Sequence, residues 1–334
     1  MSPVQTLLIG SHPLMENVRR HIARIARSDV GQVLLYGETG TGKGIVARMI
    51  HEQSSRAKRP FVGVNCAAIP GNLMESELFG HVKGAFTGAA STKQGLLGAA
   101  DGGTLFLDEV PELEHSLQAK LLTVLDSGQF RPVGSVAPLD ANVRFIAATN
   151  RVLYQEVRAR RFRDDLYYRL LVVAINLPPL RDRGNDIFEL TEHFLERFSG
   201  KYGRVIRGLE PAAREVFRQY QWPGNVRQLQ NVIERIFLLE DDSRILVKHI
   251  PPRLLLELSG DHEAMDRLYG APIREPARDS TGAVDFHLEV DKMQRALLSK
   301  AFADSQGNVA LAAERLKLSR HAFRHHWKRL QSPR

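Results

Sequence analysis

A glycine-rich stretch near the N-terminus has the spacing of a phosphate-binding loop. It reads Gly37-Glu38-Thr39-Gly40-Thr41-Gly42-Lys43, between an aliphatic run and a segment of helical period. Glycines let backbone N–H groups point at a phosphate, the following helix adds its positive end, and the lysine supplies a charge for the β- and γ-phosphates. Gly44 stands where most such loops have the Ser or Thr that binds Mg²⁺. We therefore expect the metal to depend on an acidic residue elsewhere.

An apolar run ends in two adjacent carboxylates, Asp108 and Glu109. At the carboxyl end of a parallel strand, where α/β sheets bind ligands, Asp108 would hold Mg²⁺ and Glu109 would orient and deprotonate the attacking water. In isolation the pair could be an acidic turn, but the phosphate-binding loop favours the catalytic interpretation. Asn65 and Asn150 lie at the ends of two other aliphatic runs. Asn150 would hydrogen-bond the γ-phosphate or the water, although either asparagine could be a turn residue.

These residues need a scaffold, and the chain alternates short aliphatic runs with helix-period segments, which is typical of a parallel α/β sheet. The predicted strands are Gln32–Tyr36, Phe61–Asn65, Thr104–Asp108, 143–149 and 172–177, with helices such as 45–54 and 116–127 between them. After Pro178-Pro179 the pattern is helical, over 186–198, 210–220 and 226–239. We predict an α/β ATP-binding subdomain (1–178), a helical lid (179–258), a flexible linker (259–285) and a separate all-α domain (286–334).

Composition limits where the protein works. Cys66 is the only cysteine, no apolar run approaches the roughly 18 residues of a membrane span, and the N-terminus has no basic region before its apolar stretch. We therefore expect a cytoplasmic protein without a membrane span. The net charge is +8, and residues 305–334 contribute +6 of it through seven Lys and Arg against one Glu. Such a block is typical of a polyanion-binding surface, although a solubilising tail has the same composition.

Several further motifs occur together along the chain. Gly84-Ala85-Phe86-Thr87-Gly88-Ala89 is flanked by glycine and carries a phenylalanine outside any apolar period, which suits an exposed partner loop. The others are Glu75-Ser76-Glu77-Leu78-Phe79-Gly80-His81, Phe162-Arg163-Asp164-Asp165-Leu166-Tyr167-Tyr168-Arg169-Leu170 and Trp222-Pro223-Gly224-Asn225-Val226-Arg227. In their order along the chain, over about residues 8–252, they resemble the motifs of sigma-54-dependent transcriptional activators, which are bacterial AAA+ ATPases.

The resemblance implies a AAA+ parallel-sheet ATPase core with a helical lid subdomain, plus a C-terminal all-α Fis-like helix-turn-helix domain. It implies ATP and Mg²⁺ as cofactors and a homo-oligomer that is a hexameric ring when active and a dimer at rest. Its implied partners are sigma-54 RNA polymerase holoenzyme, which ATP hydrolysis would convert from the closed to the open promoter complex, and upstream activating DNA.

The resemblance also assigns roles to single residues. Arg163 and Arg169 match arginines offered in trans to the neighbouring subunit's nucleotide, and Arg227 matches the lid arginine that senses nucleotide in cis. Asn65 matches the residue that switches the catalytic glutamate, here Glu109. Residues 84–89 match the loop that contacts sigma-54.

This chain departs from the family pattern in two ways. Gly44 replaces the acidic residue that usually follows the lysine, which bears on nucleotide coupling. The ATPase begins within about ten residues of the start, an organisation similar to the phage-shock activator, which a separate inhibitor protein restrains in trans. An inhibitor is therefore an implied partner, but Ala57 stands where that activator has the tryptophan that docks it.

The C-terminal segment reads as a helix, a turn and a second helix. Asn308 and Ser319 are predicted N-caps, Leu311 and Leu316 are predicted to face the core, and Phe323, Trp327 and Leu330 form a predicted buried stripe. The predicted DNA contacts are Ser319, Arg320, His321, Arg324, His325 and Lys328. A basic three-helix bundle that does not bind DNA is the alternative.

Two other functions share much of this sequence. One is an ATP-binding DNA regulator that does not engage sigma-54, and the other is a AAA+ machine of another kind, such as a replication initiator or an unfoldase. The intact segment 84–89 argues against the first alternative, and that segment together with the position of the basic tail argues against the second.

Overall fold

The computed structural model describes residues 8–260 and, further on, residues 298–299, 301–302, 305, 308–316, 318, 323 and 327. The chain forms two compact units, Met1–Asp261 and His262–Arg334. The predicted linker after residue 260 lies outside the described residues.

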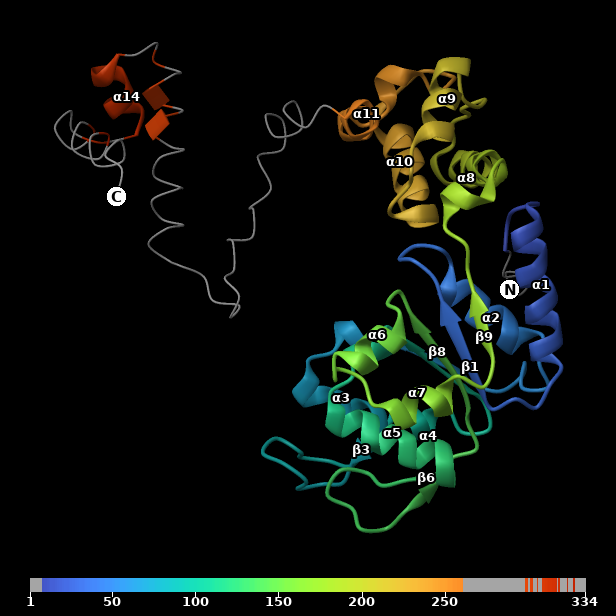
Figure 1. Cartoon of the computed structure of the whole chain (residues 1–334). Coiled ribbons are helices and arrows are strands. Elements are labelled where there is room, and N and C mark those ends of the chain that lie inside the picture. Colours follow the sequence, from blue (N-terminus) through green and yellow to red (C-terminus); the bar gives the residue numbers. More distant parts are fainter. Residues whose placement is uncertain are drawn as a thin grey trace. The chain divides into compact units, whose positions relative to one another are not determined.

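A parallel five-stranded sheet forms the centre of the first unit (Figure 1). Its strands are β1 (Gln32–Tyr36), β2 (Phe61–Asn65), β5 (Thr104–Asp108), β8 (Arg144–Thr149) and β9 (Ala174–Asn176), in the order β2-β5-β8-β1-β9. Three predicted strands have the predicted bounds. β8 begins one residue later than predicted, and β9 is shorter because only residues 174–176 pair with β1. The predicted parallel α/β core is confirmed.

Both faces of this sheet are buried, as parallel sheets require. Side chains alternate across a strand, so Leu34 packs into one cluster while Val33 and Leu35 pack into the other. The face that carries Val33 is covered by α1 (Pro13–Ala26) and α2 (Lys43–Glu52). Helices on the opposite face are α3 (Gly71–Phe79), α4 (Leu96–Ala99), α5 (His115–Ser127), α6 (Leu153–Arg158) and α7 (Asp164–Leu170).

A helical subdomain follows the sheet, as predicted (Figure 1). It consists of α8 (Asp186–Tyr202), α9 (Pro211–Gln219), α10 (Asn225–Leu239) and α11 (Pro252–Ser259), after the short 3-10 helix η3 (Leu180–Arg183). Its core contains several aromatic side chains. Trp222 is 1% exposed and packs edge-on against Phe217, with 5.2 Å between the ring centroids. Its indole N–H donates to the Phe217 carbonyl at 2.9 Å. α8 continues one turn past the predicted end, to a left-handed Gly203 cap.

Two small hairpins were not predicted. β3 (Gly80–His81) pairs with β4 (Lys93–Gln94), and β6 (Gln129–Phe130) pairs with β7 (Leu139–Asp140). Each strand has two residues, too few for an alternating pattern to be recognised in the sequence. In Figure 1 the loops of both hairpins project from the α/β core on the side away from α8–α11.

The second unit contains a small apolar cluster around α14 (Val309–Arg315). Asn308 caps this helix, since its side-chain oxygen accepts from the Leu311 N–H at 3.3 Å, and Ala312 and Ala313 are buried. The prediction for Leu311 was wrong: its side chain is 43% exposed, because the two alanines occupy the inward face. Phe323 is buried and Trp327 packs on the cluster as predicted. Leu330 and the predicted DNA contacts Ser319, Arg320, His321, Arg324, His325 and Lys328 lie outside the described residues.

Candidate functional site

The phosphate-binding loop joins β1 to α2, so its residues 37–42 lie at the carboxyl end of the sheet. Lys43 is the first residue of α2 and is only 6% exposed. Its ammonium donates to the carbonyls of Gly37 at 2.9 Å and Glu38 at 3.4 Å. A buried lysine held at the mouth of a glycine loop is a preformed anion site.

The acidic pair lies at the carboxyl end of β5, where Asp108 is the last residue of the strand and Glu109 follows it. The Lys43 ammonium lies 3.8 Å from the Glu109 carboxylate, and Glu109 has a left-handed backbone (φ 54°). Left-handed φ is costly for a residue with a Cβ and concentrates at functional sites. Asp108 has a buried side-chain oxygen, Oδ1, without a hydrogen-bond partner. A buried unpartnered carboxylate oxygen needs a cation or a water, so Asp108 fits the predicted Mg²⁺ ligand.

Both predicted asparagines lie at the same edge. Asn150 donates its backbone N–H to Glu109 at 3.3 Å and its amide to the Thr39 hydroxyl at 3.0 Å, which joins the acidic pair to the phosphate-binding loop. Asn65 lies beside Asp108 in the register of β2 and β5. Its side-chain oxygen accepts from the Ala67 N–H at 2.9 Å, so in this state it caps a short 3-10 turn instead of contacting Glu109.

A pocket of about 920 Å³ connects these groups to the lid. It is of the size that holds a nucleotide. Besides residues 39–44, Asn65, Asp108, Glu109 and Arg227, its lining includes residues that the sequence did not point to: Leu8, Ile9, Ile45, Arg183, Leu190, His193, Phe194, Arg197, Val226 and Gln230. Leu190, His193, Phe194 and Arg197 come from α8, whose sequence reads only as an amphipathic helix, and the others come from segments far apart in the chain, so no local spacing indicated them.

Arg163 and Arg169 lie outside this pocket. Arg163 precedes α7 and binds the Asp165 carboxylate through two nitrogens, at 2.7 and 3.0 Å. Arg169 contacts Asp126 at 2.9 Å and the Leu125 carbonyl at 2.8 Å. Both side chains are about 40% exposed. Neither lines the pocket of its own chain, which is the arrangement that a role in a neighbour's site requires.

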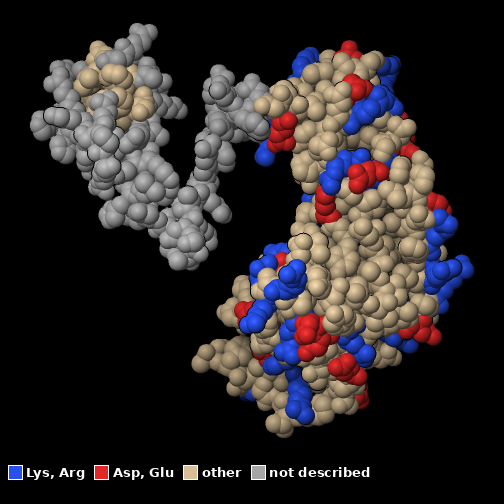
Figure 2. All heavy atoms as spheres, viewed as in Figure 1, with Lys and Arg blue, Asp and Glu red and all other residues tan. Residues whose placement is uncertain are grey.

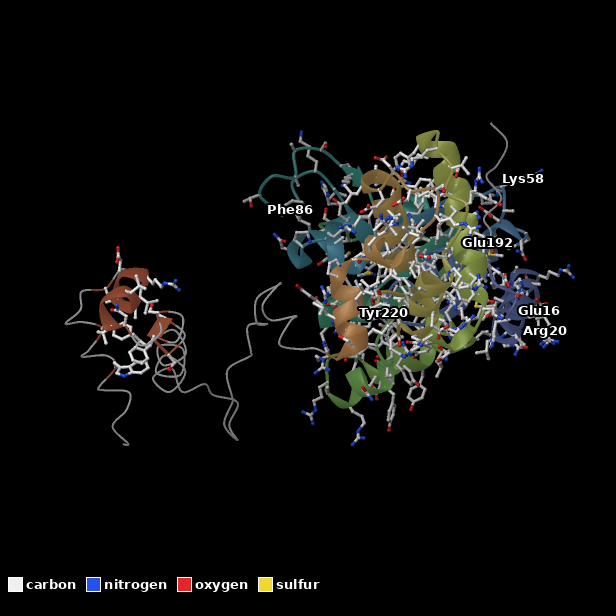
Figure 3. All side chains as sticks on the ribbon, turned by 90° about the horizontal axis from the view of Figure 1, so that it is seen from above. Glu16, Arg20, Lys58, Phe86, Glu192 and Tyr220 are labelled. Atoms are coloured by element: carbon white, nitrogen blue, oxygen red, sulfur yellow. The ribbon has the colours of Figure 1, made fainter. Side chains whose placement is uncertain are left out.

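Residues 84–89 form the tip region of the β3–β4 hairpin. Gly84 and Gly88 have positive φ (82° and 106°), and the Gly84 N–H donates to the Ala89 carbonyl at 2.9 Å, so the segment is a closed turn. Phe86 is 42% exposed and lies on the projecting loop in Figure 3. The Phe86 ring packs edge-on against the His81 ring, with 5.0 Å between the ring centroids. His81 in turn forms a hydrogen bond of 2.7 Å with the Ser76 hydroxyl. The loop therefore presents an aromatic side chain supported from its base.

Two protein-family models match this chain, one over the α/β core and one over the helical subdomain. Residues 8–176 match the family described as the Sigma-54 interaction domain. The chain belongs to this family. Residues 181–266 match the AAA+ ATPase lid domain, so the helical subdomain is such a lid.

The similar proteins are bacterial regulators. The chain is 50% identical over 246 residues to the regulatory protein LuxO of Vibrio cholerae, covering 74% of this chain and 54% of LuxO. It is 42% identical to the response regulator protein PilR of Pseudomonas aeruginosa, covering 98% of this chain and 71% of PilR. The chain thus spans only about half to two thirds of the length of several of these relatives.

A solved structure gives the same fold. NtrX from Brucella abortus in complex with ADP superposes with a TM-score of 0.71 at 32% identity, over 98% of this chain and 70% of NtrX. NtrX was also solved with ATP, at a TM-score of 0.70. Among the described residues, no helix is long and apolar enough to cross a membrane.

Proposed function

We propose that this protein is a sigma-54-dependent transcription activator. It binds ATP and hydrolyses it in a hexameric ring, which remodels the closed complex of sigma-54 RNA polymerase into the open complex. The observation that carries this proposal is the combination of an assembled phosphate-binding loop and acidic pair with a supported, exposed residue 84–89 loop on the same core. The phosphate-binding loop and acidic pair would bind and hydrolyse ATP, and the loop 84–89 would contact the polymerase.

The chain's own residues divide the hydrolysis step among them. Residues 37–44 would hold the phosphates, with Lys43 leaving its carbonyl partners for the β- and γ-phosphates. Glu109 would take a proton from the attacking water. The water oxygen would bond to the γ-phosphorus while the bond from that phosphorus to the ADP oxygen breaks. The Asn150 backbone N–H would hold the Glu109 carboxylate in position. Asp108 would hold Mg²⁺, which neutralises charge on the phosphates when bound. The described residues offer no group of three metal-ligating side chains, so phosphate oxygens would complete its coordination.

Subunit contacts complete the site in this proposal. Arg163 and Arg169 would leave Asp165 and Asp126 to neutralise charge on the neighbour's γ-phosphate, an effect worth about 10³–10⁵ in rate. Arg227 lines the chain's own pocket and would sense the nucleotide from the lid. Asn65 would switch Glu109 by leaving its present partner, the Ala67 N–H.

DNA binding is assigned to the C-terminal unit as a Fis-like helix-turn-helix on upstream activating DNA. Support comes from the Asn308 cap, the buried Ala312-Ala313 pair and the +6 charge of residues 305–334. On the face of the first unit drawn in Figure 2, Lys and Arg are interspersed with Asp and Glu, which gives that face no continuous cationic track. An inhibitor docking at residues 54–60 is not proposed, because exposed Ala57 offers little apolar surface there.

Coupled ATPase and promoter assays test the proposal. The full chain should hydrolyse ATP with a rate per subunit that rises with protein concentration as rings form. On a sigma-54 promoter it should open DNA only with hydrolysable ATP. Opening with a non-hydrolysable analogue, or with no nucleotide, would contradict the proposal.

A further inference from the structure

Three consecutive residues of the phosphate-binding loop bond directly to the lid. The side-chain amide of Asn225 donates to the Thr39 carbonyl at 3.0 Å and to the Glu38 carboxylate at 3.1 Å. The backbone N–H of Val226 donates to the Gly40 carbonyl at 3.0 Å. Asn225 is fully buried and left-handed (φ 49°), so the fold maintains a costly backbone to place this amide.

The Glu38 carboxylate makes a second lid contact. Arg181, in η3 between β9 and α8, donates two parallel bonds to its oxygens, at 2.5 and 3.0 Å. A bidentate arginine–carboxylate pair of this kind is strong and directional. The bonds from Arg181 hold the pKa of the Glu38 carboxyl below its ordinary value. Asn225 also joins η3 to the start of α10, because its side-chain oxygen accepts from the Leu180 N–H at 2.7 Å.

Glu38 also touches the phosphate-binding lysine. The Lys43 ammonium lies 3.4 Å from the Glu38 carbonyl and 2.9 Å from that of Gly37. A lysine ammonium has only three N–H groups, so a phosphate that takes one or two of them must loosen these carbonyl contacts. One residue therefore has its backbone at the phosphate site and its side chain on the lid.

We propose that Glu38 is a positioning residue that couples phosphate binding in the loop to the orientation of the lid, through Arg181 and Asn225. It does not act on the reacting atoms. Displacement of Lys43 by phosphate shifts the Glu38 backbone, and its carboxylate transmits the shift to η3 and to the start of α10. The inference rests on the proposed ATP-binding function, because the ligand that moves Lys43 is a nucleotide phosphate.

The test uses the full chain and a fluorescent methylanthraniloyl-ADP, with hydrogen exchange followed at residues 180–183 and 225–230. Glu38→Gln leaves an acceptor but puts an amide against the donors of Arg181 and Asn225. We expect about tenfold weaker nucleotide binding and loss of the ADP-dependent protection at α10. Arg181→Gln should change both readouts in the same direction, and the double variant should be no worse than Glu38→Gln alone, because Glu38→Gln already disrupts the contact with Arg181.

Glu215→Gln is the matched control. It makes the same Glu-to-Gln change at an Arg–Glu ion pair within α9 of the lid, with Arg218 at 2.7 Å, away from the phosphate-binding loop, and should leave both readouts unchanged. Wild-type affinity and wild-type protection in Glu38→Gln, or additive effects in the double variant, would overturn the coupling while nucleotide binding stands. Absence of nucleotide binding by the wild-type chain would overturn the proposed function and the coupling with it.

Discussion

Gly40 offers a sharp test of how closely the phosphate-binding loop and the lid are fitted. A Cβ at this position would lie 2.2 Å from the Gly224 carbonyl oxygen, and Gly40 has φ +81°. The left-handed backbone costs an alanine about 1–2 kcal/mol. Moving Gly224 away would also weaken the bond from the Val226 N–H to the Gly40 carbonyl, worth about 1 kcal/mol. Gly40→Ala should therefore destabilise the protein by about 2–3 kcal/mol.

Gly44→Ala, four residues later, is the matched control. Its Cβ would meet only the Phe106 ring, at 3.8 Å, and Gly44 lies in the first turn of α2. Alanine is about 0.5–1 kcal/mol better than glycine inside a helix, so this variant should be slightly more stable than wild type.

Scanning calorimetry separates the two variants. For a unit of this size 1 kcal/mol corresponds to about 2–4 °C in Tm, so Gly40→Ala should melt about 4–12 °C lower and Gly44→Ala about 1–4 °C higher. Gly40→Ala should also bind methylanthraniloyl-ADP at least tenfold more weakly. An unchanged Tm and affinity in Gly40→Ala would refute the close fit of loop and lid described above.

Three further predictions concern the site. Lys43→Ala should lose ATP binding, whereas Glu109→Gln should keep it and lose hydrolysis by about 10²–10⁴; near-normal turnover in Glu109→Gln would remove its role as base. Arg169→Ala should bind ATP without hydrolysing it, and mixing it with Lys43→Ala should partly restore turnover, since one variant supplies the nucleotide and the other the arginine; no recovery would count against a site shared between subunits. Burial raises the pKa of Cys66 to about 12, so iodoacetamide at pH 8 should leave the native thiol intact and alkylate it in urea; rapid labelling of native protein would contradict its burial.

The sequence predicted the parts of the site that are local in the chain. The loop 37–43, the pair Asp108 and Glu109, and Asn150 each lie at the carboxyl end of a strand of strong apolar pattern, and parallel strands bring such ends to one edge. The structure places all of them there.

The remaining parts depend on long-range packing. His193 and Phe194 reach the pocket from α8, and Arg181 meets Glu38 across 143 positions of sequence. No spacing rule connects residues so far apart. The same holds for Leu311, whose exposure depends on which face of a short helix the rest of the unit covers.

Open-complex formation on a sigma-54 promoter by Thr87→Ala most directly tests the central claim. Thr87 lies in the projecting loop and does not line the nucleotide pocket. The variant should therefore hydrolyse ATP like the wild type, yet leave the promoter closed in a permanganate footprint with purified sigma-54 polymerase. Promoter opening equal to that of the wild type would contradict the assignment of residues 84–89 to the polymerase.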